Sequence, residues 1–307
     1  MNKATSKKAL LKYLASLLIF GSNGVMVCHI DMTSYEIVFL RTLLGSAFLV
    51  VLFKILGNSF HIKEHKRDAI FVAIAGILQG VSWVLLYEGY RAIGVGVSSL
   101  IYYCGPIILM AFSPLLFKEK LTANRLLGFA IVIVGLLFVN GTALLLGGTS
   151  KSTWGYIASI LSAVTFFLML AFNKQSKHIV GMENAVIQLT FSFIALAVFI
   201  GFKQQFIMTI PSSSVPWIIV QGILNTGIGC YLYFSPLSEL PVQTVAVCGY
   251  LEPLSAVVFA AIFLGETMTA IQIIGAICII GGAMFAEVFG SKQFLLKQRL
   301  REKYKDR

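Results

Sequence analysis

The chain alternates between long apolar runs and short polar breaks. Ten runs are long enough to form membrane-crossing helices, because a helix needs about 20 apolar residues to cross roughly 30 Å of hydrocarbon. They lack the strict alternation of apolar and polar positions that marks a barrel strand, so we predict an all-α membrane protein with ten transmembrane helices. The predicted spans are residues 11–30, 35–56, 69–88, 96–117, 124–145, 153–173, 182–202, 215–235, 242–264 and 268–289.

Composition supports a membrane protein. Hydrophobic residues make up 58% of the 307 positions and charged residues only 12%, with a mean hydropathy of +0.87. A soluble domain could not bury that much apolar surface, so lipid is expected to surround the chain. The first run has no cleavage-site pattern and contains Asn23, which predicts a retained first span and not a removed signal peptide.

The positive charge is distributed unevenly along the chain. With the N-terminus placed in the cytoplasm, cytoplasmic segments and helix ends hold 20 Lys and Arg residues, and the opposite side holds three. This asymmetry predicts a multi-pass protein of the cell membrane with both termini cytoplasmic. The basic tail, residues 291–307, is then an orientation signal near anionic lipid. Nucleic-acid binding is the weaker reading of the net charge of +11.

An internal repeat appears when the sequence is compared with itself at an offset. Six residues have identical counterparts 147 positions later, and shorter matches occur at offsets of 146 and 143. The pairs at 147 are Tyr103/Tyr250, Pro106/Pro253, Glu119/Glu266, Thr122/Thr269, Gly128/Gly275 and Gly135/Gly282. Each repeat then holds five spans, and an odd number places the second copy upside down relative to the first. Inverted repeats are a recurring design of transporters, in which two similar packings give states open to opposite sides.

The same residues carry a family resemblance over roughly residues 11–289. The chain resembles the EamA family of the drug/metabolite transporter superfamily through Gly21-Ser22-Asn23-Gly24, Leu40-Arg41, Pro106, Glu119-Lys120-Leu121-Thr122, Leu251-Glu252-Pro253 and Gly265-Glu266. The resemblance implies two EamA-like repeats, residues 1–148 and 149–290, and a metabolite carrier, usually an exporter, powered by an ion gradient or by exchange. Span 1 departs from the pattern, because Ser22-Asn23 stands where a tryptophan is often found.

Polar side chains at membrane depth predict a central cavity, because they are costly unless they face a cavity or a partner. One face of span 3 carries Gln79, Trp83 and Tyr87 at four-residue spacing, and the equivalent face of span 8 carries Gln221, Asn225 and Tyr233. We expect these residues and Asn23 to contact a small-molecule substrate. Interhelical hydrogen bonding is the structural alternative.

Glu252 is the most specific candidate for a functional residue, because it places a carboxyl beside Pro253 near the middle of span 9. A proline removes a backbone hydrogen bond and opens the helix. The carboxyl is expected to couple transport to a proton or to pair with a substrate amine, with a purely structural role as the alternative. Three tyrosines beside Pro106 and Pro253 are expected to stack on substrate or to pack, namely Tyr102, Tyr103 and Tyr250.

Other charged residues favour structural roles. Arg41 lies one third into span 2, where we expect it to pair with a helix carbonyl or a carboxylate as an anchor, with an anionic substrate as the alternative. Glu119 and Glu266 end equivalent helices and are interpreted as inherited helix caps or gate contacts.

The sequence disfavours an enzyme. His61-Ile62-Lys63-Glu64-His65 matches an inverted zincin spelling, but it lies in a short cytoplasmic loop without room for the long helix and third ligand of a zinc site. We expect no metal and no cofactor, and we find no phosphate-binding loop that would indicate ATP-driven transport. The prediction is a secondary active transporter of an amino acid or related metabolite. A multidrug or amphiphile exporter is the alternative, and an intramembrane enzyme is less favoured.

Overall fold

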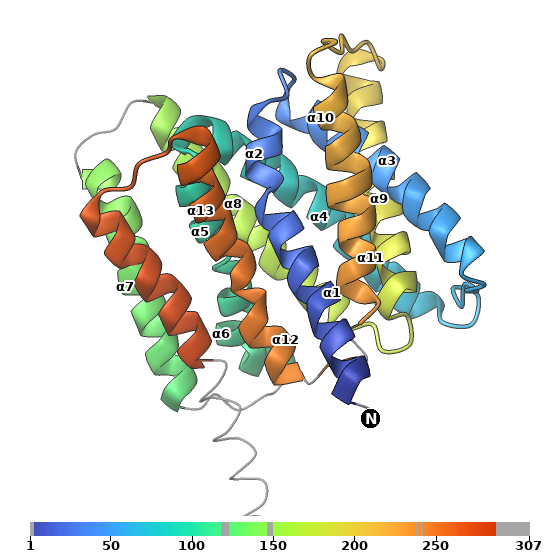
Figure 1. The fold of residues 1–307 in the computed structure, drawn as a ribbon, viewed down its shortest axis with the longest axis horizontal. Coiled ribbons are helices and arrows are strands. Elements are labelled where there is room, and N and C mark those ends of the chain that lie inside the picture. The colour runs from blue at the N-terminus through green and yellow to red at the C-terminus, as the bar shows by residue number, and fades with distance from the viewer. Residues whose placement is uncertain (1–2, 118–122, 146–149, 237–238, 241, 287–307) are drawn as a thin grey trace, which may run out of the picture.

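The chain folds into a bundle of helices, seen in a computed structural model that describes residues 3–117, 123–145, 150–236, 239–240 and 242–286. The described residues form helices and no strand (Figure 1). The helices are α1 (Lys3–Gly21), α2 (Asn23–Cys28), α3 (Ser34–Ile55), α4 (Lys66–Ile93), α5 (Val95–Tyr102), α6 (Gly105–Phe117), α7 (Ala123–Leu145), α8 (Ser150–Asn173), α9 (Gly181–Gln204), α10 (Val215–Ile219), the π-helix η1 (Val220–Ile228), α11 (Gly229–Phe234), α12 (Val242–Gly249), α13 (Leu251–Leu264) and a last helix, Ala270–Ala286.

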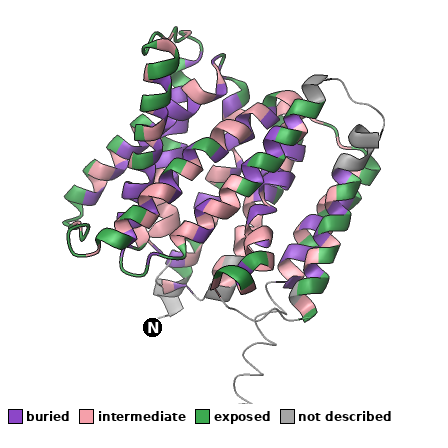
Figure 2. Cartoon of the chain, turned by 180° about the vertical axis from the view of Figure 1, so that it is seen from behind, coloured by how far each residue is buried: buried purple, intermediate pink, exposed green. Residues whose placement is uncertain are grey.

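The predicted fold class is confirmed. Seven helical stretches are long and apolar enough to cross a membrane, and three shorter apolar helices occupy the positions of predicted spans 5, 9 and 10. Local sequence sets several ends: Thr33 and Glu36 form a capping box at the start of α3, and Gly265, in a left-handed conformation, ends α13. Figure 2 shows exposed residues on the outside of the bundle. Many of them are large apolar residues, such as Leu115, Phe202 and Ile277, as expected for a protein in lipid.

Helix packing follows the symmetry of two inverted repeats. Span 2 (α3) packs on span 8 (η1), and the equivalent pair, span 7 (α9) and span 3 (α4), packs in the same way. Likewise α1 packs on α13, and α8 packs on α5 and α6. These contacts between different spans of the two repeats therefore occur twice, once in each direction, as a two-fold relation requires.

Spans 5 and 10 show the inversion at single-residue level. These two helices, α7 and Ala270–Ala286, lie side by side at one end of the bundle (Figure 1). A side-chain carbon on Gly128 would lie 2.6 Å from the Gly282 carbonyl, and one on Gly135 would lie 2.7 Å from the Gly275 carbonyl. Each glycine thus faces the repeat mate of the other, as antiparallel helices related by a two-fold axis must. Close backbone approach explains this glycine stripe.

Spans 4 and 9 are broken at equivalent places. The first break lies between α5 and α6 at Tyr103 and Cys104, and the second between α12 and α13 at Tyr250. The sequence predicted that Pro253 opens the helix of span 9. Instead Pro106 and Pro253 lie in the first turn of a new helix, where a missing N–H leaves no hydrogen bond unmade. The predicted repeat boundary at residue 148 and the tail 291–307 lie outside the described residues.

Candidate functional site

A cavity of about 260 Å³ lies in the centre of the bundle. It runs from Asn23 and Ser99 to Asn173 and Phe234, the last residues of α8 and α11. These two helix ends belong to the same end of the bundle as the start of α1, which we call the basic face (lower side of Figure 1). The opposite end, with loops 29–33 and 205–214, is the distal face. None of the described residues of those two loops lines the cavity.

Arg41 is the centre of a buried polar cluster on the cavity wall. Its side chain is only 3% exposed. Nε donates to Thr226 Oγ1 at 3.0 Å, Nη1 to Asn23 Oδ1 at 3.1 Å and to the Tyr87 hydroxyl, and Nη2 to Asn225 Oδ1 at 3.5 Å. Gln221 adds bonds to Asn23 and to the Tyr87 hydroxyl. We call Arg41, Asn23, Tyr87, Gln221, Asn225 and Thr226 the Arg41 cluster.

The guanidinium keeps a capacity to bind a ligand. It lies 4.1 Å from the Trp83 ring centroid, and the four hydrogen bonds leave one of its five N–H groups without a partner among the described residues. Where the structure is described, ion pairs join histidines to carboxylates and none includes Arg41. Arg41 is thus anchored by amides and hydroxyls, and not by the helix carbonyl or carboxylate that the sequence predicted. Its positive charge lies beside the cavity with no described carboxylate in ion-pairing contact.

The π-helix η1 explains how span 8 supplies three members of the Arg41 cluster. A wider turn brings residues four and five positions apart onto one face, so Gln221, Asn225 and Thr226 point together. Thr226 Oγ1 donates to the Gln221 carbonyl five residues earlier at 2.8 Å. The sequence pattern predicted only a four-residue spacing here, and therefore did not find Thr226.

A second polar cluster lines the cavity nearer the basic face. Asn173 Nδ2 donates to Gln188 Oε1 at 2.6 Å, Gln188 Nε2 donates to Gln79 Oε1, and Asn184 Nδ2 donates to Asn173 Oδ1 at 3.1 Å. We call these four residues the Gln188 cluster. Gln188 follows Arg41 by 147 positions, the repeat offset, and Asn225 follows Gln79 by 146. The two clusters are therefore repeat counterparts, one charged and one neutral, and sequence analysis identified only Gln79 of the second.

Glu252 lies on the same cavity wall, in the first turn of α13. Tyr103 lines the same part of the cavity. Its repeat counterpart, 147 positions earlier, is Gly105, so only the second repeat carries a carboxylate at this break. The helix N-terminus favours a negative charge there. One cavity thus contains a guanidinium and a carboxyl from different repeats.

The structure brings most predicted site residues to the cavity, but not all. The lining includes Asn23, Arg41, Gln79, Trp83, Tyr102, Tyr103, Asn225, Tyr233 and Glu252. Tyr87 and Gln221 are fully buried behind the wall, where they support Arg41, and Tyr250 packs in an apolar cluster beside it. Glu266 lies on the distal face, and Glu119 is outside the described residues. Three aromatic and apolar residues of α8 also line the cavity, namely Phe166, Met169 and Leu170. Sequence analysis did not find them, because it searched for polar side chains at membrane depth.

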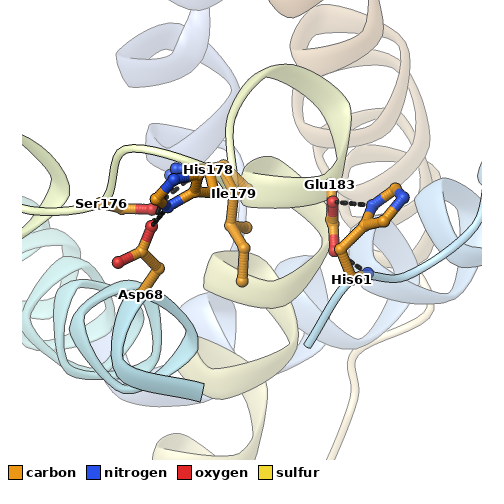
Figure 3. A network of polar contacts seen from close by, with 7 residues as sticks. His61, Asp68, Ser176, His178, Ile179 and Glu183 are labelled. Atoms are coloured by element: carbon orange, nitrogen blue, oxygen red, sulfur yellow. Dashed lines mark hydrogen bonds and ion pairs between the residues drawn. The ribbon is translucent and has the colours of Figure 1, made fainter. Parts of the chain in front are cut away.

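At the basic face, histidines of the loops that precede α4 and α9 contact carboxylates in the first turns of α9 and α4 (Figure 3). Asp68 Oδ2 accepts from the backbone N–H of His178 at 2.8 Å and lies 2.9 Å from His178 Nδ1. Glu183 accepts from the His61 backbone at 2.6 Å and lies 3.1 Å from His61 Nδ1, which raises the pKa of His61 above its usual value. His65 stacks on His178. The two histidines of the zincin-like spelling therefore have separate partners, and the described residues hold no group suited to a metal ion.

Family comparison agrees with this architecture. The model of the EamA-like transporter family matches the chain twice, over residues 7–141 and 153–287. The chain belongs to the EamA-like transporter family. Two matches of similar length correspond to the two repeats, and members of this family are multi-pass membrane proteins.

Several EamA-type relatives are similar over most of the chain. The uncharacterized transporter YxxF of Bacillus subtilis is 26% identical over 89% of this chain and 88% of its own length. The threonine/homoserine exporter RhtA of Escherichia coli is 27% identical over 84% and 83%. A probable amino-acid metabolite efflux pump of Salmonella typhimurium is 26% identical over 64% and 68%. A crystal structure with 15% identity covers 92% of this chain and 99% of its own, with a TM-score of 0.63, which shows the shared fold.

Proposed function

We propose that the chain exports a small zwitterionic metabolite, an amino acid or a close analogue, across the cell membrane by alternating access. The observation that carries the proposal is that Arg41 and Glu252 line the same cavity, while no described ion pair joins them. An uncompensated charge in a membrane interior is costly unless a partner neutralises it. A zwitterion neutralises both, with its carboxylate on Arg41 and its ammonium on Glu252.

The size of the cavity supports a small cargo. Sites for drug-sized molecules occupy roughly 300–1,000 Å³, and this cavity is smaller, at about 260 Å³. Trp83, Tyr102 and Phe166 supply aromatic surface for the non-ionic part of the cargo. A multidrug or amphiphile exporter would need more space and fewer charges. The names of two relatives, a threonine/homoserine exporter and a probable amino-acid metabolite efflux pump, support the same substrate class and the outward direction.

Glu252 provides a route to proton coupling within this proposal. When no cargo is bound, a carboxyl at this depth is expected to be neutralised by a proton, and an arriving ammonium replaces that proton. Exchange of one cation for the other links export of cargo to entry of protons. The cavity extends to the basic face of the bundle. We propose that this face is cytoplasmic and that both termini lie on that side. Reporters fused after Phe60 and after Ile93 should read cytoplasmic and external, and a reversed pair would contradict this orientation.

Binding to the purified protein tests the proposal directly. We would measure thermal stabilisation by each of the twenty protein amino acids, and then compare the best of them with its decarboxylated amine and its deaminated acid. The zwitterion should bind at least tenfold more tightly than either analogue, because each analogue leaves one charge unpaired. Stabilisation by amphiphilic cations alone, or equal binding of all three compounds, would contradict the proposal.

Glu252→Gln separates the two roles of the carboxyl. It should lose the preference for the zwitterion over the deaminated acid, and cargo binding should no longer release a proton into weakly buffered solution. Net flux and cargo exchange should then fail together. If exchange survives and only net flux is lost, Glu252 couples protons without holding the ammonium, and the zwitterion assignment is wrong.

A further inference from the structure

Glu266 joins the two repeats across the distal face. Its carboxylate accepts a hydrogen bond from the backbone N–H of Val95 to Oε1 at 2.6 Å and another from Gly96 to Oε2 at 2.9 Å. Val95 and Gly96 are the first residues of α5, in the first repeat, whereas Glu266 follows α13 in the second. Both oxygens of one carboxylate therefore hold the N-terminus of a helix in the opposite repeat, where free N–H groups and the helix dipole favour an anion.

Two glycines allow this contact. Gly265, in a left-handed conformation, ends α13, and the Glu266 N–H then bonds back to the Ala260 carbonyl at 3.2 Å, so the chain turns toward α5. Gly94, which precedes α5, has φ +89°. A side-chain carbon on Gly94 would lie 3.0 Å from Glu266 Oε1. The local backbone is thus shaped for close approach of the carboxylate.

The contact lies directly above the cavity. The α5 helix carries Ser99 and Tyr102 to the cavity wall, and α13 carries Glu252 and Ala256. These two helices pack against each other beneath Glu266. A separation of α5 and α13 at their distal ends would open this part of the cavity wall toward the distal face, and it would break the hydrogen bonds that the Val95 and Gly96 N–H groups donate to Glu266.

We propose that Glu266 is the distal gate residue of the transport cycle: its carboxylate latches α5 to α13 while the cavity is open to the basic face, and releases them in the state open to the distal face. The inference rests on the proposed transport function, but it concerns the gate and not the cargo. Glu266 acts by positioning α5 and contacts no substrate. Weakening the latch should therefore favour the state open to the distal face, whichever molecule is carried.

A cysteine placed in the cavity tests the latch without any cargo. In a background that lacks the native cysteines, Ser99→Cys would be labelled with a membrane-impermeant thiol reagent, applied separately to each face of sealed vesicles. Glu266→Gln should raise the labelling rate from the distal face on the order of tenfold, as loss of one charge-assisted hydrogen bond would. A glutamine keeps one acceptor but turns an NH₂ group toward the second backbone N–H.

Glu36→Gln is the matched control. Glu36 is also a carboxylate at a helix N-terminus on the distal face, but its partners are Thr33 and Gln204, away from α5 and α13. It should leave labelling from the distal face within twofold of the parent. An unchanged rate in Glu266→Gln, or an equal rise in Glu36→Gln, would overturn the proposal.

Gly94→Ala supplies an independent route if Glu266→Gln folds poorly. The added methyl group meets the carboxylate, and φ +89° disfavours any side chain at this position, so the start of α5 should shift and the latch should weaken although the charge of Glu266 remains. The double variant with Glu266→Gln should then label no faster than the faster single variant, since both changes remove one contact. Additive effects, or no increase in Gly94→Ala, would show that Glu266 does not control the distal opening.

Discussion

The Arg41 and Gln188 clusters occupy equivalent places in the two repeats but differ in charge. Both join span 2 or 7 to span 8 or 3, and both line the cavity. The first is built around a guanidinium with four hydrogen bonds to side chains. In the second, a chain of neutral amides takes its place. An inverted repeat can thus keep its packing geometry while only one copy carries a charged group.

The difference has a physical basis. Neutral amides satisfy one another within the membrane, so the Gln188 cluster is complete without cargo. A guanidinium cannot lose its charge and needs an anion or several dipoles around it. The Arg41 cluster supplies the dipoles but no carboxylate in ion-pairing contact, so cargo with a carboxylate would complete it. We expect changes in the two clusters to affect transport and stability to very different degrees.

The largest effect is expected for Arg41→Gln. Asn23, Tyr87 and Thr226 would lose a buried donor, at about 1–3 kcal/mol for each polar group left unpaired, and transport should fall by about two orders of magnitude. Thermal unfolding of purified protein and cargo flux measure the two effects. Gln188→Ala, at the counterpart position, should reduce flux only a few-fold. Similar losses of flux in both variants would show that the two clusters contribute equally to transport.

Arg41→Lys sharpens this comparison. A lysine keeps the charge but not the planar fork that reaches Thr226, Asn23 and Asn225 together. We expect cargo affinity to fall about tenfold while the preference for a zwitterion over its decarboxylated amine remains. Loss of that preference would contradict the assignment of the cargo carboxylate to this charge.

An intermediate effect is expected for the amides at equivalent positions of the two repeats, Gln79 and Asn225. Asn225→Ala should weaken transport about tenfold, because Asn225 holds both Arg41 and the Ile19 carbonyl, whereas Gln79→Ala should weaken it only a few-fold. Abundance of each variant in the membrane should stay near normal. Loss of folded protein in both would favour interhelical bonding over cargo contact as the role of these amides.

The smallest effect concerns the basic face below the Gln188 cluster. Glu183 raises the pKa of His61 in the folded protein. The contact between protonated His61 and Glu183 should therefore stabilise loop 57–65 in full at pH values below about 6.5, the ordinary pKa of histidine. This stabilisation should be lost as the pH rises through the higher pKa of the folded state. Protease cleavage of the loop should accelerate over that interval. In His61→Gln, which has no titrating ring, cleavage should show no such dependence; a persistent dependence would place the titrating group elsewhere.

The sequence by itself determined the architecture. Apolar runs of span length, the 147-residue offset and the paired glycines predicted ten helices in two inverted repeats, because lipid requires each span to satisfy its own backbone. The same pattern found most of the cavity, since polar residues at membrane depth are few and costly. Gln79, Asn225 and Glu252 needed no structure to be selected.

Only the tertiary structure decided how these residues divide into clusters. Arg41 and Asn225 are 184 positions apart, and no local pattern shows that they meet. Tyr87 and Gln221 match the helical period of the cavity face, yet they lie behind the wall, because the wider turn of η1 and the packing of α1, α3 and α4 set which way each side chain points. Helical period fixes which residues share a face, whereas packing between distant spans fixes what that face contacts.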